Sequence, residues 1–99
     1  MGFDFAARRI GSTKTENIGE ISEDVHEAIF LRCRNSRFRK LLGDYYKTKC
    51  IFRGNEIAEL VKFLNESKQS ISPIQSYQIE EIVNAIAANE NEFISVQGD

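Results

Sequence analysis

The apolar positions of residues 50–64 give the clearest structural signal in the chain. A short apolar run from Cys50 to Phe52 precedes a Gly-Asn break, and apolar residues then recur at the i, i+3, i+4 and i+7 positions of one helix face: Ile57, Leu60, Val61 and Leu64. Asn55 suits the N-cap of this helix, because its side-chain oxygen can accept a hydrogen bond from a first-turn N–H. The segment therefore predicts a strand that leads directly into a core-facing helix.

A second stripe of the same spacing lies toward the C-terminus: Ile79, Ile82, Val83 and Ile86. Pro73 stops any earlier helix and can occupy the first turn of the next one. We expect this second helix to begin between Ile74 and Tyr77 and to end near Asn89.

Two more helices are predicted between residues 22 and 45. Ser22, with two acidic residues directly after it, is typical of a helix start, and this helix is expected to end near Arg34 or Asn35. Ser36 can cap a further helix, whose apolar residues recur at near-helical spacing: Phe38, Leu41, Leu42 and Tyr45. The alternative that both helices run together through Asn35 stays open.

Three short segments have the character of strands: Phe3 to Arg8, Lys49 to Phe52 and Phe93 to Val96. The stretch from Gly11 to Gly19 is polar and without periodicity, so we expect a loop there. The pattern as a whole predicts a single α+β domain over residues 1–99, with three short strands and three to four helices packed on one face of the sheet.

Composition narrows the class of protein. The chain has 99 residues, of which 41% are hydrophobic, which suffices for one modest core. No window approaches the roughly 18 consecutive apolar residues of a membrane span, and the N-terminus lacks the features of a secretion signal, so a cytoplasmic protein without a membrane partner is expected. Cys33 and Cys50 are too few for a disulfide framework and are expected to be buried free thiols.

The formal net charge of −2 conceals a segregation of charge along the chain. Residues 1–31 carry a net charge of −3, residues 32–53 carry +7 and residues 54–99 carry −6. Such blocks can steer charged partners, but a small fold can equally lay the basic block against the acidic ones and cancel them. Both outcomes stay open at the level of sequence.

The sequence offers little support for catalysis. His26 is the only histidine, whereas a zinc site would need three or four ligands, so we interpret it as a structural residue at the surface or half-buried. Neither a G-x-S-x-G motif nor a glycine-rich phosphate loop is present. We therefore expect no enzyme activity, no metal, no cofactor and no small-molecule substrate.

Acidic residues gather where the predicted loop meets the first helix: Glu16, Glu20, Glu23, Asp24 and Glu27. These carboxylates could bind a basic protein partner by taking the place of phosphates, with Ile18 and Ile21 exposed between them as apolar contacts. The alternative is that the acids complement the helix dipole and keep the protein soluble.

The basic block provides a second candidate interface, for nucleic acid: Arg32, Arg34, Arg37, Arg39 and Lys40. Cations of this kind neutralise phosphates, and aromatic residues such as Phe38 and Tyr45 could stack on exposed bases. The alternative places these two rings in the core and the cations on a solvated face. The acidic chain, with a pI near 5.5, disfavours a dedicated nucleic-acid binder.

The start Met1-Gly2-Phe3-Asp4-Phe5, followed by a glycine-bounded polar stretch, resembles small bacterial and phage-type orphan proteins. The acidic, single-domain, signal-free remainder is similar in character to the immunity proteins of contact-dependent growth inhibition and related polymorphic toxin systems. This resemblance implies a cytoplasmic bacterial protein that binds one cognate toxin, often a nuclease, and blocks its active site.

Overall fold

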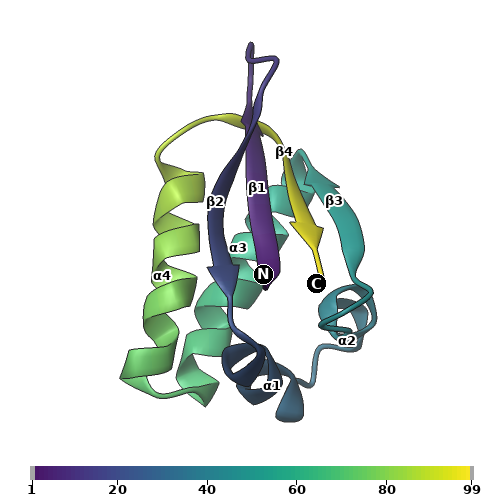
Figure 1. Ribbon diagram of the computed structural model, residues 1–99, viewed down its shortest axis with the longest axis vertical. Coiled ribbons are helices and arrows are strands. Elements are labelled where there is room, and N and C mark those ends of the chain that lie inside the picture. The colour runs from purple at the N-terminus through teal and green to yellow at the C-terminus, as the bar shows by residue number, and fades with distance from the viewer. Residues whose placement is uncertain (1, 99) are drawn as a thin grey trace.

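The computed structural model describes residues 2–98. The strands and helices follow one another in this order, as shown in Figure 1: β1 (Phe3–Arg9), β2 (Thr15–Ile21), α1 (Glu23–Leu31), α2 (Ser36–Leu42), β3 (Lys49–Arg53), α3 (Asn55–Ser67), a short 3-10 helix (Lys68–Ser70), α4 (Pro73–Ala87) and β4 (Asn91–Gln97). The α+β class expected from the sequence is thus confirmed. Over the described residues the sheet has four strands, however, and the expectation of three was wrong.

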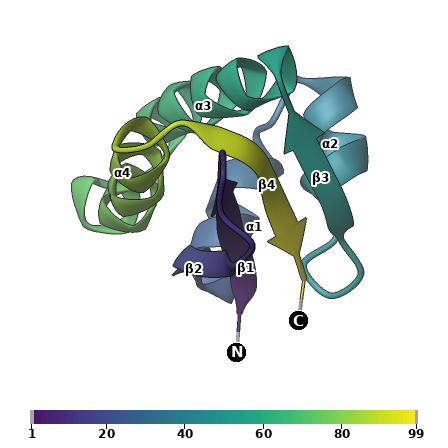
Figure 2. The same ribbon diagram turned by 90° about the horizontal axis from the view of Figure 1, so that it is seen from above.

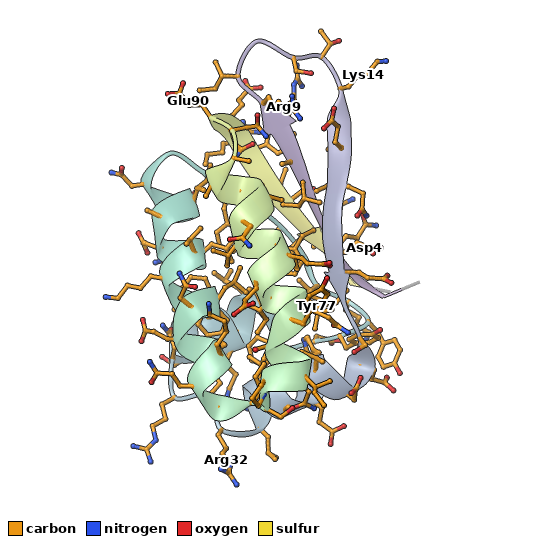
Figure 3. All side chains as sticks on the ribbon, turned by 90° about the vertical axis from the view of Figure 1, so that its left-hand side faces the viewer. Asp4, Arg9, Lys14, Arg32, Tyr77 and Glu90 are labelled. Atoms are coloured by element: carbon orange, nitrogen blue, oxygen red, sulfur yellow. The ribbon has the colours of Figure 1, made fainter. Side chains whose placement is uncertain are left out.

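The four strands form an antiparallel sheet in the order β2-β1-β4-β3. Phe3, Phe5 and Ala7 of β1 are buried, whereas the residues between them point to the opposite face. Figure 2 shows α3 and α4 along one side of the sheet. Figure 1 shows α1 and α2 at the lower end of the sheet. The face away from the helices, called the open face below, carries Asp4, which Figure 3 shows pointing away from them.

The strand that the sequence did not predict is β2. The stretch from Gly11 to Gly19 was expected to be a loop, but most of it pairs with β1, from Thr15 opposite Arg8 to Ile21 opposite Phe3. The turn at its start is irregular, and the pairing shifts register once, between the pairs Phe5–Gly19 and Ala6–Asn17. Ile21 is 2% exposed and Ile18 is partly buried, so the expectation that both are exposed was wrong. Pairing with β1 turns Ile21 toward the core.

The two long helices follow their apolar stripes, but the ends of the helices differ from expectation. Gly54, and not Asn55, is the N-cap of α3, and its positive φ of 57° suits glycine. α4 begins earlier than expected, at Pro73, where Ser72 and Gln75 form a capping box. Its last residue, Ala87, lies close to the expected end.

α1 and α2 are separate helices. α1 ends at Leu31, before the expected Arg34 or Asn35. Asn35, and not Ser36, caps α2, because its side-chain Oδ1 accepts a hydrogen bond from the N–H of Phe38 at 3.1 Å. The chain therefore turns between the two helices, and residues 32–34 stand outside both.

Three phenylalanine rings join α2, β3 and α3. Phe38 stacks on Phe63 with 4.5 Å between ring centroids and on Phe52 with 6.0 Å. Ring pairs of this kind add about 0.5–1.5 kcal/mol each beyond the area they bury. Cys33 and Cys50 are free thiols at the margin of this core, but they are partly and not fully buried. Burial raises the pKa of the Cys50 thiol to about 11.

We predict that Gly19→Ala destabilises the fold. Gly19 lies where the pairing of β1 with β2 shifts register, and its φ is 152°. An added Cβ would lie 2.7 Å from Cγ1 of Ile82 on α4, which is too close for two carbon atoms. Urea denaturation should show a loss of about 1–3 kcal/mol in the free energy of unfolding. In an Ile82→Ala background the same substitution should cost clearly less, and strictly additive costs would contradict this explanation.

Candidate functional site

A hollow at the lower end of the molecule combines carboxylates with apolar side chains. Glu23 and Glu27 project from neighbouring turns of α1, and Asp44 comes from the connection between α2 and β3. The hollow has a volume of about 440 Å³ and the following lining: Glu23, His26, Glu27, Phe30, Leu31, Gly43, Asp44, Tyr45 and Tyr46. We call it the acidic hollow.

The connection that forms one wall of the acidic hollow is held by Asp44. Its Oδ1 accepts hydrogen bonds from the backbone N–H groups of Tyr46 and Lys47, each at 3.0 Å. Its carbonyl oxygen accepts a bond of 2.7 Å from the Thr48 hydroxyl. An aspartate that binds the backbone of the following residues in this way fixes a turn. The position of the Asp44 carboxylate is therefore set before any partner arrives.

Two large side chains are exposed at the rim of the acidic hollow. Tyr46 is 60% exposed, and its hydroxyl donates a hydrogen bond to the carboxylate of Glu23 across the hollow. Leu31, the last residue of α1, is 72% exposed. The surface thus offers carboxylates beside an aromatic and an aliphatic side chain, and aromatic residues are enriched at protein interfaces.

His26 forms the floor of the acidic hollow and is structural. Its Nε2 donates a hydrogen bond of 2.8 Å to the carbonyl oxygen of Leu42, and its ring contacts Phe3 and Phe30 at centroid distances of 4.6 Å. Burial lowers the pKa of His26, although the Leu42 carbonyl and the charges of Asp44 and Glu23 oppose this effect. The structural role agrees with the sequence interpretation, but the side chain is fully buried and not at the surface.

The remaining acidic residues of the predicted cluster lie outside the acidic hollow. Asp24 is exposed on the first turn of α1, where the hydroxyl of Ser22 binds its Oδ1 at 2.6 Å and lowers the pKa of Asp24. Ser22 is the N-cap, but its hydroxyl makes no capping bond to the helix. Glu20 is exposed near the end of β2, opposite Asp4 on β1.

Glu16 is separated from the others, because it lies at the opposite end of β2 and forms an ion pair of 3.4 Å with Arg9. The sequence therefore identified Glu23 and Glu27 of the hollow but missed Asp44 and Tyr46. Asp44 is the one acid of the basic block, and nothing in the local sequence signals that the chain returns to α1 at this point.

The basic candidates are divided between internal contacts and the surface. Arg37 forms ion pairs with Glu56 and Glu59 of α3. Arg39 donates to the carbonyl oxygen of Cys33 at 3.1 Å and also to that of Phe30, which satisfies backbone groups after α1. All five residues are exposed, and within residues 2–98 the side chains of the other three form no ion pair or hydrogen bond; Figure 3 shows the first of them extending from the lower end of the molecule: Arg32, Arg34 and Lys40. Part of the basic block is thus neutralised within the fold.

Comparison with known proteins finds no relative: no protein-family model, curated protein or solved structure matches the chain. Within residues 2–98, no group of three or more His, Cys, Asp or Glu side chains is placed to hold a metal ion. In the same range no helix has the length and apolar character needed to cross a membrane. The functional argument therefore depends on the surfaces just described.

We predict that His26 makes the fold less stable as the pH falls from 7 to 5. The unfolded chain binds a proton at His26 with a pKa near 6.5, whereas the folded chain binds it only at lower pH. The stabilisation from neutral His26 is therefore complete above about pH 6.5 and is lost as the pH falls toward the folded pKa. Urea titrations at several pH values should show this slope.

His26→Gln provides the control, because glutamine can still donate to the Leu42 carbonyl but does not titrate. The variant should show a flatter dependence of unfolding free energy on pH between 7 and 5. An unchanged slope would assign the pH dependence to other groups.

Proposed function

We propose that this chain is a cytoplasmic immunity protein that binds one toxin protein and covers its active site with the acidic hollow. The partner we propose is a nuclease, because the active site of such a toxin binds phosphates through cations and would accept carboxylates in their place. The exposed carboxylates of Glu20 and Asp24, which lie outside the hollow, would extend the contact.

One observation supports this proposal above the others. Within residues 2–98, no lysine or arginine forms an ion pair with Glu23, Glu27 or Asp44, although several other acids of the chain are paired. Carboxylates that lie close together without a cationic partner raise the negative potential of the surface, and this speeds association with a basic partner. Tyr46 and Leu31 supply the apolar contact that such charges lack, and tyrosine is frequent among residues that dominate binding energy.

The favourable interaction of acids with the dipole at a helix N-terminus explains only part of this arrangement. Glu23 and Asp24 lie in the first turn of α1 and complement its dipole. Glu27 is one turn further, and Asp44 belongs to a different segment, so the dipole of α1 does not explain their place beside Glu23. A binding surface accounts for all three hollow carboxylates together.

We predict that Glu23→Lys combined with Glu27→Lys abolishes protection against the cognate toxin. Both side chains are exposed, so reversal should cost the fold only about 0.3–1 kcal/mol at Glu23, where the helix dipole and the Tyr46 hydroxyl favour a carboxylate, and less at Glu27, which lies beyond the first turn. Reversing charges inside an interface typically costs about 2–5 kcal/mol or more of binding. Calorimetry against a candidate toxin encoded by a neighbouring gene would measure the loss, and a growth assay with that toxin would show the lost protection.

The matched control is Glu16→Lys combined with Glu90→Lys, which makes the same charge change at the opposite end of the molecule. Figure 3 shows Glu90 at that end together with Arg9, the ion-pair partner of Glu16. We expect this variant to bind the toxin nearly as well as the wild type. Equal losses for both variants would indicate a general charge effect and would contradict a specific role for the acidic hollow.

Nucleic-acid binding through the basic candidates is the competing function. It requires that the chain shift labelled RNA or DNA at low salt, and that Arg32→Ala with Arg34→Ala and Lys40→Ala reduce both the affinity and its salt dependence. Our proposal predicts no shift at low salt, since the internal contacts of Arg37 and Arg39 leave a diminished basic surface. A shift that these alanine substitutions abolish would favour the competing function.

A further inference from the structure

β3 is an edge strand whose outer side is open. Among residues 2–98 it pairs with β4 alone, and Figure 1 shows no further strand beyond it. The N–H of Gly98 donates to the carbonyl oxygen of Thr48 at 2.7 Å, which places Thr48 among the residues hydrogen-bonded to β4. Along antiparallel strands, residues that hydrogen-bond to the neighbouring strand alternate with residues that do not, so Cys50 and Phe52 also bond to β4. The backbone N–H and C=O groups of the alternate residues, Lys49 and Ile51, therefore point outward.

Arg53 agrees with this alternation of inward-bonding and outward-pointing residues, and it marks the end of the open edge. Its backbone N–H is bound by Oε1 of Glu56 at 3.2 Å, so it does not bond to β4. The outward N–H groups of Lys49 and Ile51 have no such internal acceptor among the described residues. A partner strand could therefore pair with β3 from Lys49 to the carbonyl of Arg53.

The side chains along this edge alternate between charge and apolar surface. Lys49, Ile51 and Arg53 project to the open face, and Ile51 is 49% exposed. The Arg53 guanidinium lies over the ring of Phe93 at 5.1 Å, which holds it on this face. A shallow hollow of about 420 Å³ adjoins Ile51 and the small side chain of Ser95. The edge therefore presents an apolar site between two cations.

Charge makes a second copy of this chain a poor occupant. Antiparallel pairing of two β3 edges centred on Ile51 would place Lys49 of each copy opposite Arg53 of the other. Like charges directly opposite each other destabilise strand pairing, and natural edge strands use such charges to prevent self-association. The same two cations would attract a strand that carries acids in the facing positions.

We propose that the β3 edge binds an extended segment of a partner protein in which an acidic, an apolar and a second acidic residue occupy alternate positions. Main-chain hydrogen bonds to Lys49 and Ile51 would supply affinity, and the facing side chains would supply specificity. This surface is separate from the acidic hollow, so the inference does not depend on the proposed toxin partner.

The chain itself provides a probe of the required chemistry. Lys49→Glu combined with Arg53→Glu converts β3 into a folded strand with the acidic, apolar, acidic pattern. Isotope-labelled wild type titrated with this unlabelled variant should show NMR shifts at the backbone amides of Lys49 and Ile51. We expect this pair to associate at least about fivefold more tightly than either protein associates with itself.

Two controls make this titration decisive. Arg32→Glu combined with Arg34→Glu makes the same charge change away from the edge, and it should shift neither amide. Ile51→Pro in the labelled protein removes one outward N–H while leaving the bonds of Cys50 and Phe52 to β4, and it should abolish the effect. Shifts that are equal for both titrants, or the absence of shifts, would overturn the proposal.

The single substitutions give an independent test by sedimentation. Lys49→Glu alone, or Arg53→Glu alone, makes β3 complementary to itself, so each variant should dimerise at concentrations where the wild type and the double variant remain monomeric. Lys47→Glu, which lies before β3, should stay monomeric. If both single variants remain monomers, the edge does not accept a strand.

A nucleic acid is the other possible occupant of this face, and oligothymidylate serves as its probe. We would compare the shift of the Phe93 amide with oligothymidylate and the shift of the Ile51 amide with the double variant. A stronger shift with oligothymidylate would indicate that the face binds nucleic acid and would overturn the proposal.

Discussion

The sheet buries only one of its faces, and the rest of the fold depends on this asymmetry. The central strands β1 and β4 direct Phe3, Phe5, Ile94 and Val96 to the same side, where they are almost completely buried. Every helix has to contribute to covering that side, because apolar surface of this size is costly to leave in water. The opposite face consequently carries mainly short, polar and charged side chains, together with the larger apolar side chains of Ile51 and Phe93. The two surfaces for which we propose partners lie along the edge strand β3 and beside α1 at the lower end of the sheet.

Folding redistributes the charge blocks of the sequence and neither preserves nor simply cancels them. Arg37 and Arg39 are directed to acids and carbonyl groups of neighbouring elements, whereas Lys49 and Arg53 remain on the open face. Asp44 leaves the basic block and joins the acids of α1. The molecule therefore carries two small surfaces of opposite sign, one acidic beside α1 and one basic along β3.

The sequence predicts those elements whose apolar residues repeat. β1 and the long helices α3 and α4 follow directly from such patterns. β2 could not be predicted in this way, because only Ile21 in it is fully buried and Gly19 interrupts it; it is a strand because β1 pairs with it. Likewise the spacing of Glu23 and Glu27 shows that they share a helix face, whereas the approach of Asp44 depends on where a connection returns in space. Local pattern defines faces, and tertiary contact assembles sites from them.

β1 pairs with β4, so that Asp4 lies opposite Gln97, and the two strands are far apart in the sequence. During synthesis β1 is therefore made long before its partner β4. β1 and β2 can form a hairpin soon after they leave the ribosome, but an isolated hairpin is only marginally stable in water. The other edge of β1, with Phe5 beside it, stays uncovered until Val96 has been synthesised. Contacts so distant in sequence also slow folding, since a long loop must close before they form. Early truncation products of this protein should consequently be targets for chaperones and proteases, because they expose an unpaired apolar strand.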